Sequence, residues 1–343
     1  MKFLLIAIIS FGLLSSMCSE PLIVQDSVKP AAAASHSEMG QKIREYLASN
    51  HVSGSISVVK NGMTLFSEGA GYSDISEQTL NRPTTTYPIG SITKTMVAVC
   101  ILQLQEKGKL RIQDPVSKYV PSLPKDVKII HLLNHTSGIR APIWHAGDQK
   151  PKDIIKKAAV KFPAGTKWDY NDINYIVLGY IVEQVTGGTL HDYIEKNIFE
   201  KASMVNAGFI NSGTISSKGY FKVAGQFLNS SKLNPSLLFG CGDIYATAQD
   251  ISLFDEALMT GKLLNNPSVK EMVTPGPKSS YGLGVYHKDD RIYSRGVVGG
   301  WESLHVYYKD KTSIVVLLNV RDKQGDIKNI ADDIYRIVKE EFS

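Results

Sequence analysis

The sequence predicts an α/β protein in which one antiparallel sheet is flanked by helices and a mainly helical region is inserted between its strands. Alternating apolar residues, typical of strands, occur near residue 55 and again beyond residue 281. The middle of the chain, about 91–260, has apolar residues at helical spacing instead. We therefore expect the early and late strands to pair in one sheet around the helical insertion.

The first 38 residues do not resemble the rest of the chain. Residues 1–18 have the layout of a secretory signal peptide, because Lys2 precedes the apolar run Phe3–Leu14, which is too short to span a bilayer. Residues 19–38 are rich in Ala, Pro and Ser and predict a linker. A single domain is expected over 39–343, in a protein that is exported and either extracellular or associated with the cell envelope.

The three cysteines carry different expectations. Cys18 is a candidate for membrane attachment through a lipid, but the bulky Met17 beside it disfavours this reading. Cleavage of the signal near 31–34, a run of alanines, is the alternative. Cys100 and Cys241 remain in the mature chain, and we expect both to be free thiols.

Turns and periodicity place the elements in order. Apolar residues at four-residue spacing predict a helix over 37–50. The alternation at 55–58 leads into Asn61-Gly62, a pair typical of tight hairpin turns, and a second strand follows at 63–66. The later helices are expected at 92–107, 152–161, 174–185, 190–199, 248–259 and 326–341, and the later strands at 281–287, 291–297, 302–308 and 312–319.

Composition excludes several classes of function. The net charge is +5, and no run of Lys or Arg has the density of a nucleic-acid-binding patch. The charge supports only a weak preference for anionic surroundings. No spacing of His, Cys and carboxylates resembles a metal site, and no glycine-rich loop of the phosphate-binding type is present. We expect no cofactor, no metal and no nucleic-acid partner.

Two Ser-x-x-Lys tetrads are candidates for a nucleophile with its base. In the first, Ser57 lies in an alternating strand, where a residue three positions on points to the opposite face, so Lys60 cannot reach its hydroxyl. In the second, Ser91 opens a helix, where Lys94 lies one turn away on the same side. The helix is apolar nearly all round, and its burial is expected to lower the pKa of Lys94. A capping serine with a solvated lysine is the alternative.

Five segments, the first of which contains Ser91 and Lys94, decide between these alternatives. They read Pro-Ile-Gly-Ser-Ile-Thr-Lys at 88–94, Leu-Leu-Asn-His-Thr-Ser-Gly at 132–138 and Phe-Pro-Ala-Gly-Thr-Lys-Trp-Asp-Tyr at 162–170, with two more at 175–187 and 240–250. In this order they resemble the serine β-lactamase and penicillin-binding-protein superfamily, in particular its class C, D-alanyl carboxypeptidase and esterase branch. The resemblance implies a β-lactamase/transpeptidase-like fold and acyl transfer through Ser91.

The second motif of that superfamily, Tyr-x-Asn, falls on residues 170–172. The resemblance implies that Tyr170 is a general acid/base that shares protons with Ser91 and Lys94. Asp172 departs from the motif, because an ionised Asp accepts hydrogen bonds but cannot donate one to a substrate carbonyl. It is equally suited to holding a substrate ammonium or to capping the helix expected to follow.

The third motif, a basic residue followed by a hydroxyl residue and glycine, is altered. Gly300-Trp301 places Arg295 at the basic position, as a candidate for binding carboxylate or phosphate, although one residue must be gapped. The resemblance also implies an oxyanion hole formed by the Ser91 N–H and an N–H near Val298. His135, in the second matching segment, is expected to tie down a loop by hydrogen bonds.

The leading hypothesis is a serine hydrolase that acts through an acyl-enzyme on a D-alanyl ester or peptide of the cell wall. Its partner would be a cell-wall peptide or a D-alanylated polymer. A β-lactamase or a promiscuous small-ester hydrolase is one alternative, since it would tolerate both altered motifs. A non-catalytic protein that keeps the fold of penicillin-binding proteins is another, and the intact Ser91, Lys94 and Tyr170 argue against it.

Overall fold

The computed structural model describes residues 37–142, 149–210, 215–230, 232–321 and 326–342. The predicted signal peptide, Cys18 and most of the predicted linker lie outside these ranges. All described residues belong to one unit, Ala31–Ser343. Among them, no helix combines the length and the apolar character needed to cross a membrane.

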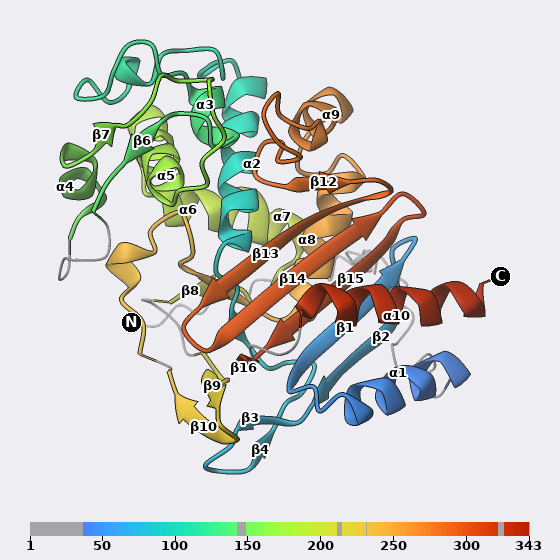
Figure 1. The fold of residues 1–343 in the computed structure, drawn as a ribbon. Helices are drawn as coiled ribbons and strands as arrows, with labels where there is room; N and C mark the ends of the chain where they lie inside the picture. The colour runs from blue at the N-terminus through green and yellow to red at the C-terminus, as the bar shows by residue number, and fades with distance from the viewer. Residues whose placement is uncertain (1–36, 143–148, 211–214, 231, 322–325, 343) are drawn as a thin grey trace, which may run out of the picture. The chain divides into compact units, whose positions relative to one another are not determined.

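A six-stranded antiparallel sheet forms the centre of this unit (Figure 1). The early hairpin pairs with the late strands through β1 and β15, as predicted. Its turn residues Asn61 and Gly62 have φ of +50° and +75°, the left-handed values that a tight two-residue hairpin turn requires. In order across the sheet, the strands are β12 (Tyr286–Lys288), β13 (Arg291–Val298), β14 (Trp301–Tyr308), β15 (Thr312–Leu318), β1 (Gly54–Lys60) and β2 (Met63–Ala70).

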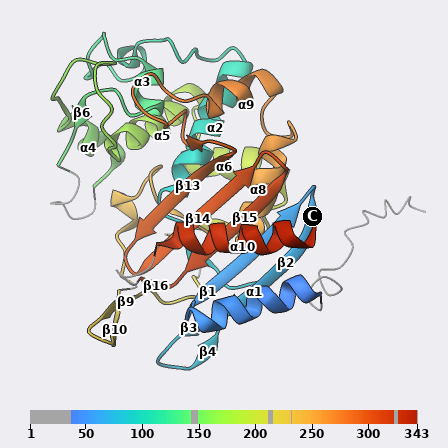
Figure 2. The same ribbon diagram turned by 45° about the vertical axis from the view of Figure 1, so that its right-hand side comes forward.

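Helices α1 (Glu38–Ser49) and α10 (Ile327–Glu341) cover one face of the sheet (Figures 1 and 2). Each presents one apolar stripe to the strands, as an amphipathic surface helix does. Ser37 caps α1 by accepting a hydrogen bond from the Gly40 N–H. The buried side chains of this layer include Ile43, Leu47, Ile334 and Val338.

The helical insertion covers the opposite face. Helix α8 (Ala248–Met259) packs on β1 and β15, and α2 (Ile92–Glu106) packs on β13 and on α5 (Ile173–Thr186). Every residue of α2 from Ile92 to Leu104 is buried, so this helix is the centre of the larger core. The remaining helices are α3 (Ile129–Leu133), α4 (Pro151–Lys156), α6 (Leu190–Ile194), α7 (Glu200–Ala202) and α9 (Asn266–Val273).

Short strands connect the insertion to the sheet. They are β5 (Tyr87–Pro88), β11 (Ile244–Ala246) and β8 (Gly208–Phe209) in one small sheet, and β10 (Gln226–Asn229), β9 (Tyr220–Val223) and β16 (Val320–Arg321) in another. Strands β3 (Tyr72–Asp74) and β4 (Thr79–Leu80) form a hairpin, and β6 (Ile139–Arg140) pairs with β7 (Ala159–Val160). The middle of the chain is therefore less purely helical than predicted.

Three predicted elements are wrong in part. The helix expected over 152–161 ends at Lys156, because residues 159–160 pair as a strand with β6. The helix expected over 190–199 changes to a π-helix over Glu195–Phe199. The strand expected over 281–287 begins only at Tyr286, since Gly284 has φ of +87° and turns the chain.

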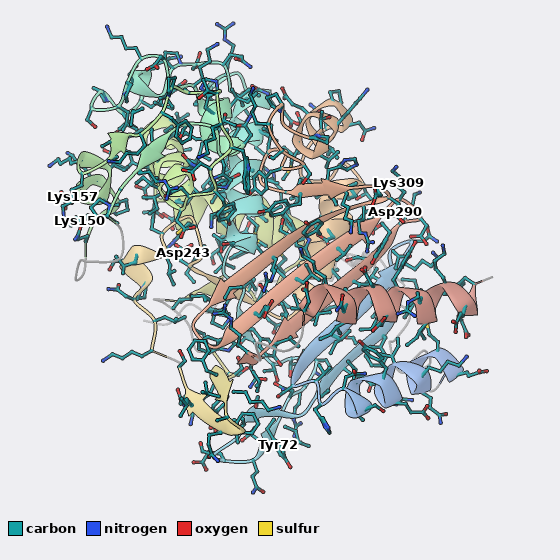
Figure 3. All side chains as sticks on the ribbon, viewed as in Figure 1. Tyr72, Lys150, Lys157, Asp243, Asp290 and Lys309 are labelled. Carbon is teal, nitrogen blue, oxygen red and sulfur yellow. The ribbon has the colours of Figure 1, made fainter. Side chains whose placement is uncertain are left out.

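Charged side chains are spread over separate elements. Lys150 and Lys157 flank α4, whereas Lys309 lies in the turn between β14 and β15, near Asp290 (Figure 3). Cys100 and Cys241 are free thiols, as predicted, and both are buried. Their burial raises the pKa of both thiols, so neither is a ready nucleophile.

Candidate active site

Ser91 and Lys94 lie in contact at the start of α2. The Lys94 ammonium Nζ donates a hydrogen bond of 2.8 Å to Ser91 Oγ, the contact that i,i+3 spacing on a helix allows. Strand β5 leads into this turn and pairs with β11. The Ile89 N–H also donates a hydrogen bond of 3.0 Å to Ile244 O of β11. In the other Ser-x-x-Lys tetrad, Lys60 forms an ion pair with Asp310 instead of contacting Ser57.

Gly90 brings the edge of β13 close to the nucleophile. Its φ is +51°, a left-handed value that a side chain would strain. A Cβ at this position would lie 3.0 Å from the main-chain nitrogen of Val297. Val298 lines the same pocket as Ser91. The end of β13 therefore runs directly beside the turn that carries Ser91.

Lys94 is fully buried and has a partner for each N–H. Besides Ser91 Oγ, Nζ donates to Cys241 O at 2.9 Å and contacts Asp172 Oδ1 at 2.8 Å. Burial by itself would lower the pKa of Lys94, but the Asp172 carboxylate and Tyr170 outweigh it and raise that pKa above its ordinary value. The lowered pKa expected from the sequence is wrong, because the helix pattern contains no information about Asp172. Lys94 is an ammonium at neutral pH.

Asp172 occupies the first position before α5, yet its side chain does not cap that helix. The carboxylate turns to Lys94 instead, and a quarter of the side chain remains exposed. Asn171 Oδ1 accepts from the Ile173 N–H at 3.3 Å in its place. Of the two roles expected for Asp172, the structure does not contain the helix cap. The other role, holding a substrate ammonium, would have to compete with Lys94.

Tyr170 lies over the same lysine. Its ring centre is 5.1 Å from Lys94 Nζ, a cation–π distance, and 4.2 Å from the ring of His135. His135 O accepts from the Asp169 N–H at 2.8 Å, and His135 Nδ1 accepts from the Asn171 N–H at 3.3 Å. The predicted loop-anchoring role of His135 is thereby confirmed. Burial and the Lys94 charge hold the pKa of His135 well below its ordinary value, so it anchors the loop as a neutral ring.

A pocket of about 380 Å³ opens over Ser91. Gly90, Asp172 and the end of β13 line it, together with apolar side chains that include Leu237. Two cations missed in the sequence, Lys232 and Arg321, also line it. A larger pocket of about 940 Å³, lined by α1, β2 and β10, contains neither Ser91 nor Lys94. We place the site at the smaller pocket, because the nucleophile Ser91 lines it together with Asp172, the carboxylate that contacts Lys94.

Arg295 is not brought to Ser91. Its Nε donates to Glu302 Oε1 at 2.6 Å. Side chains alternate along a strand, and the neighbouring Ser294 points to α2, where it contacts Thr95 at 2.9 Å. Arg295 therefore points to the opposite face of the sheet from α2 and does not line the pocket over Ser91.

Comparison with known proteins places this geometry in a family. The Beta-lactamase family model matches residues 39–335. PbpX of Bacillus subtilis (strain 168), named as a penicillin-binding protein, is 37% identical over 314 residues, covering 89% of this chain and 80% of its own. The teichoic acid D-alanine hydrolase of Staphylococcus aureus (strain MRSA252) is 32% identical over 313 residues, covering 86% of this chain and 78% of its own.

Solved structures agree with this assignment. The crystal structure of FmtA from Staphylococcus aureus superposes with a TM-score of 0.79 at 26% identity, covering 89% of this chain and 90% of that one. The penicillin-binding protein of Bacillus halodurans gives a TM-score of 0.76 at 25% identity, covering 86% and 99%. The predicted β-lactamase/transpeptidase-like fold is confirmed. The chain belongs to the β-lactamase family and is a serine hydrolase.

Proposed function

We propose that this protein hydrolyses D-alanyl esters of a cell-wall polymer through an acyl-enzyme on Ser91. The observation that carries the proposal is the hydrogen bond of 2.8 Å from Lys94 Nζ to Ser91 Oγ, at the floor of an open pocket. The likeness to a teichoic acid D-alanine hydrolase over 86% of this chain supports the choice of substrate. The intact contact between serine and lysine speaks against a non-catalytic protein.

In the first half of the reaction, Ser91 Oγ attacks the ester carbonyl and its proton passes to Lys94 Nζ. Lys94 must be neutral to accept it, and Asp172 makes the neutral fraction small at neutral pH because it raises the pKa of the lysine. The Ser91 N–H and an N–H at the edge of β13, near Val298, hold the oxyanion. The new ammonium of Lys94 then protonates the departing alkoxide, so the proton balance closes.

Water releases D-alanine in the second half. It attacks the acyl carbonyl and transfers a proton to Lys94 Nζ. We assign Tyr170 a supporting acid/base role, because its ring lies 5.1 Å from Lys94 Nζ. Ser91 Oγ is the leaving group and takes back a proton, which restores the resting enzyme.

The place of action follows from the same proposal. A D-alanylated wall polymer lies outside the cytoplasmic membrane, so the enzyme must be exported, in agreement with the signal peptide expected over residues 1–18. We propose an extracellular or envelope-associated hydrolase. Mass spectrometry of the mature N-terminus would decide whether Cys18 is modified by a lipid.

The test is D-alanine release from a D-alanylated polymer by the purified protein, combined with fluorophosphonate labelling and mass spectrometry of the labelled peptide. We expect release by the native protein, none by Ser91→Ala, and the label on Ser91. Ser57→Ala is the matched control, since Ser57 belongs to the other Ser-x-x-Lys tetrad. Equal release by Ser91→Ala and the native protein, or a label on another residue, would overturn the proposal.

A further inference from the structure

Two basic side chains line the Ser91 pocket without being part of the catalytic group. Lys232 follows β10, and Arg321 ends β16. Neither forms an ion pair with another described residue. Among the described residues that line this pocket, the one carboxylate is that of Asp172, and it is already matched by Lys94 at 2.8 Å. Among the described lining residues, Lys232 and Arg321 therefore carry positive charge that no described carboxylate matches.

Arg321 is held in place from two sides. Strand β16 pairs in parallel with β9, with Arg321 opposite Phe221, and the guanidinium carbon lies 5.9 Å from the centre of the Phe221 ring. Phe221 also lines the pocket. A guanidinium on an aromatic face keeps its edge N–H groups free for an anion. The aromatic ring therefore limits the positions that the cation can take.

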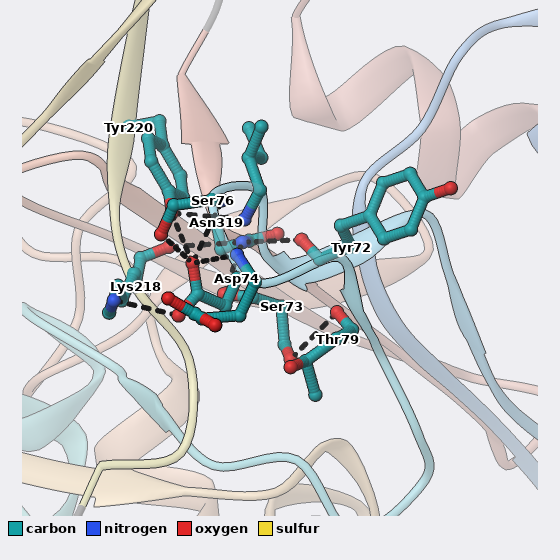
Figure 4. Close-up of polar contacts among 10 residues, drawn as sticks. Tyr72, Ser73, Asp74, Ser76, Thr79, Lys218, Tyr220 and Asn319 are labelled. Atoms are coloured by element: carbon teal, nitrogen blue, oxygen red, sulfur yellow. Dashed lines mark hydrogen bonds and ion pairs between the residues drawn. The ribbon is translucent and has the colours of Figure 1, made fainter.

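A buried polar network anchors the strands that carry these residues (Figure 4). Asn319, just before β16, is fully buried, and its Nδ2 donates to Tyr72 O at 2.9 Å and Lys218 O at 3.0 Å. The Tyr220 N–H donates to Asn319 O at 2.8 Å, and the Tyr220 hydroxyl donates to Asp74 at 3.0 Å. These bonds tie β9 and β16 to the β3–β4 hairpin. The base of the Arg321 strand is therefore fixed before any substrate binds.

We propose that Lys232 and Arg321 form an anion subsite that binds a phosphodiester of the substrate while its D-alanyl ester reaches Ser91. The proposal rests on the proposed function and names the chemistry next to the scissile ester. A phosphodiester is a singly charged group whose oxygens suit both an ammonium and the planar fork of a guanidinium. Arg295, the candidate from the sequence, is replaced in this role by residues that line the pocket.

The experiment compares three substrates on the full-length protein. They are a D-alanyl ester of a glycerol phosphodiester, the D-alanyl ester of uncharged glycerol, and a peptide ending in D-Ala-D-Ala, whose carboxylate is the other anion the subsite could accept. The test protein carries Lys232→Gln and Arg321→Gln. Lys109→Gln with Lys125→Gln removes the same charge at two exposed positions outside the pocket and serves as the control.

For the native protein and the control, we expect kcat/KM to favour the phosphodiester over the glycerol ester by roughly 10–100-fold, the usual effect of charge-assisted hydrogen bonds. In the test protein the ratio should fall to within about threefold, because the loss of rate falls on the phosphodiester substrate. Arg321→Lys should keep most of the preference, because it keeps the charge. A native ratio near one, or an unchanged ratio in the test protein, would overturn the subsite. A loss confined to the peptide would assign it to a carboxylate and reject the phosphodiester.

A binding measurement separates failure of the subsite from failure of the proposed function. Calorimetry with glycerophosphoglycerol, a phosphodiester without D-alanine, needs no hydrolysis. We compare the Ser91→Ala protein with the same protein that also carries Lys232→Gln and Arg321→Gln. Binding by the first and none by the second supports the subsite even if no ester is cleaved. Equal binding by both proteins, or no binding by either, rejects the subsite whatever the hydrolysis assays show.

Discussion

Replacing Asp172 with Asn tests how the charge of Lys94 is set. The amide is nearly isosteric and keeps an oxygen that can accept from Lys94 Nζ at the present distance of 2.8 Å. Only the negative charge is lost. Because that charge raises the pKa of Lys94, the pKa must fall in the variant, while Ser91 and the lysine keep their contact.

The size of the effect follows from the burial of the pair. Lys94 is fully buried and Asp172 is a quarter exposed, so solvent screens the pair only partly. An opposite charge at this distance shifts a pKa by about 1–3 units. A shift of about 2 units makes the neutral amine roughly 100-fold more abundant at neutral pH. The amine is also a weaker base, which offsets about half of the gain on a logarithmic scale, so kcat/KM should rise about tenfold.

The assay is the pH profile of kcat/KM for a D-alanyl ester and for its N-acetylated counterpart. The rising limb should move to lower pH by about 1–3 units in Asp172→Asn, equally for both esters, since the charge acts on Lys94. Asp169→Asn is the matched control, because Asp169 lies in the same loop and pairs with Arg140. A profile that does not move would refute the role of Asp172 on Lys94. An effect confined to the free-amine ester would show that the carboxylate serves the substrate ammonium instead.

Three further changes test other parts of the site. Tyr170→Phe should lower kcat on a D-alanyl ester by a factor on the order of 10²–10⁴; near-normal turnover would leave Lys94 as the sole proton carrier. Gly90→Ala should lower both kcat/KM and the free energy of unfolding, the latter by about 1–3 kcal/mol, because φ is +51° and the new Cβ would press on Val297 N. A Gly90→Ala protein with full activity and native stability would contradict this prediction. Hydrogen bonds from Lys218 and Ser76 hold the pKa of Asp74 below its ordinary value, so its stabilisation is present above about pH 4 and is lost as the pH falls. Urea unfolding of Asp74→Asn should show a weaker loss of stability on acidification than the native protein shows.

Much of the fold and the central contact of the site follow from local patterns. The pair of Ser91 and Lys94 depends only on the start of one helix and on its 3.6-residue period, so the sequence predicts it directly. The same holds for the hairpin at Asn61-Gly62, where two left-handed residues fix the turn. Such features need no knowledge of the rest of the chain.

The charge of Lys94 could not be predicted in that way. It depends on Asp172 and on Cys241 O, which come from distant parts of the sequence and meet only in the folded chain. The prediction that Arg295 lies in the site is wrong for a related reason. A motif search fixes a position along β13, whereas the face to which a side chain points depends on strand alternation. Lys232 and Arg321 carry no motif at all, and only the pairing of β16 with β9 brings Arg321 to the pocket.

The Asp at position 172 also bears on the choice between ester and amide substrates. At rest the Lys94 ammonium donates to Ser91 Oγ, which opposes attack but places a proton donor next to the leaving oxygen. An ester carbonyl is intrinsically more electrophilic than an amide carbonyl, so an ester tolerates the weakened nucleophile better than an amide does. Asp172→Asn should therefore accelerate a D-alanyl amide more than the matching ester, and a fall in the ester-to-amide ratio of kcat/KM would be the sign of it. An unchanged or larger ratio would mean that the high pKa of Lys94 does not select esters.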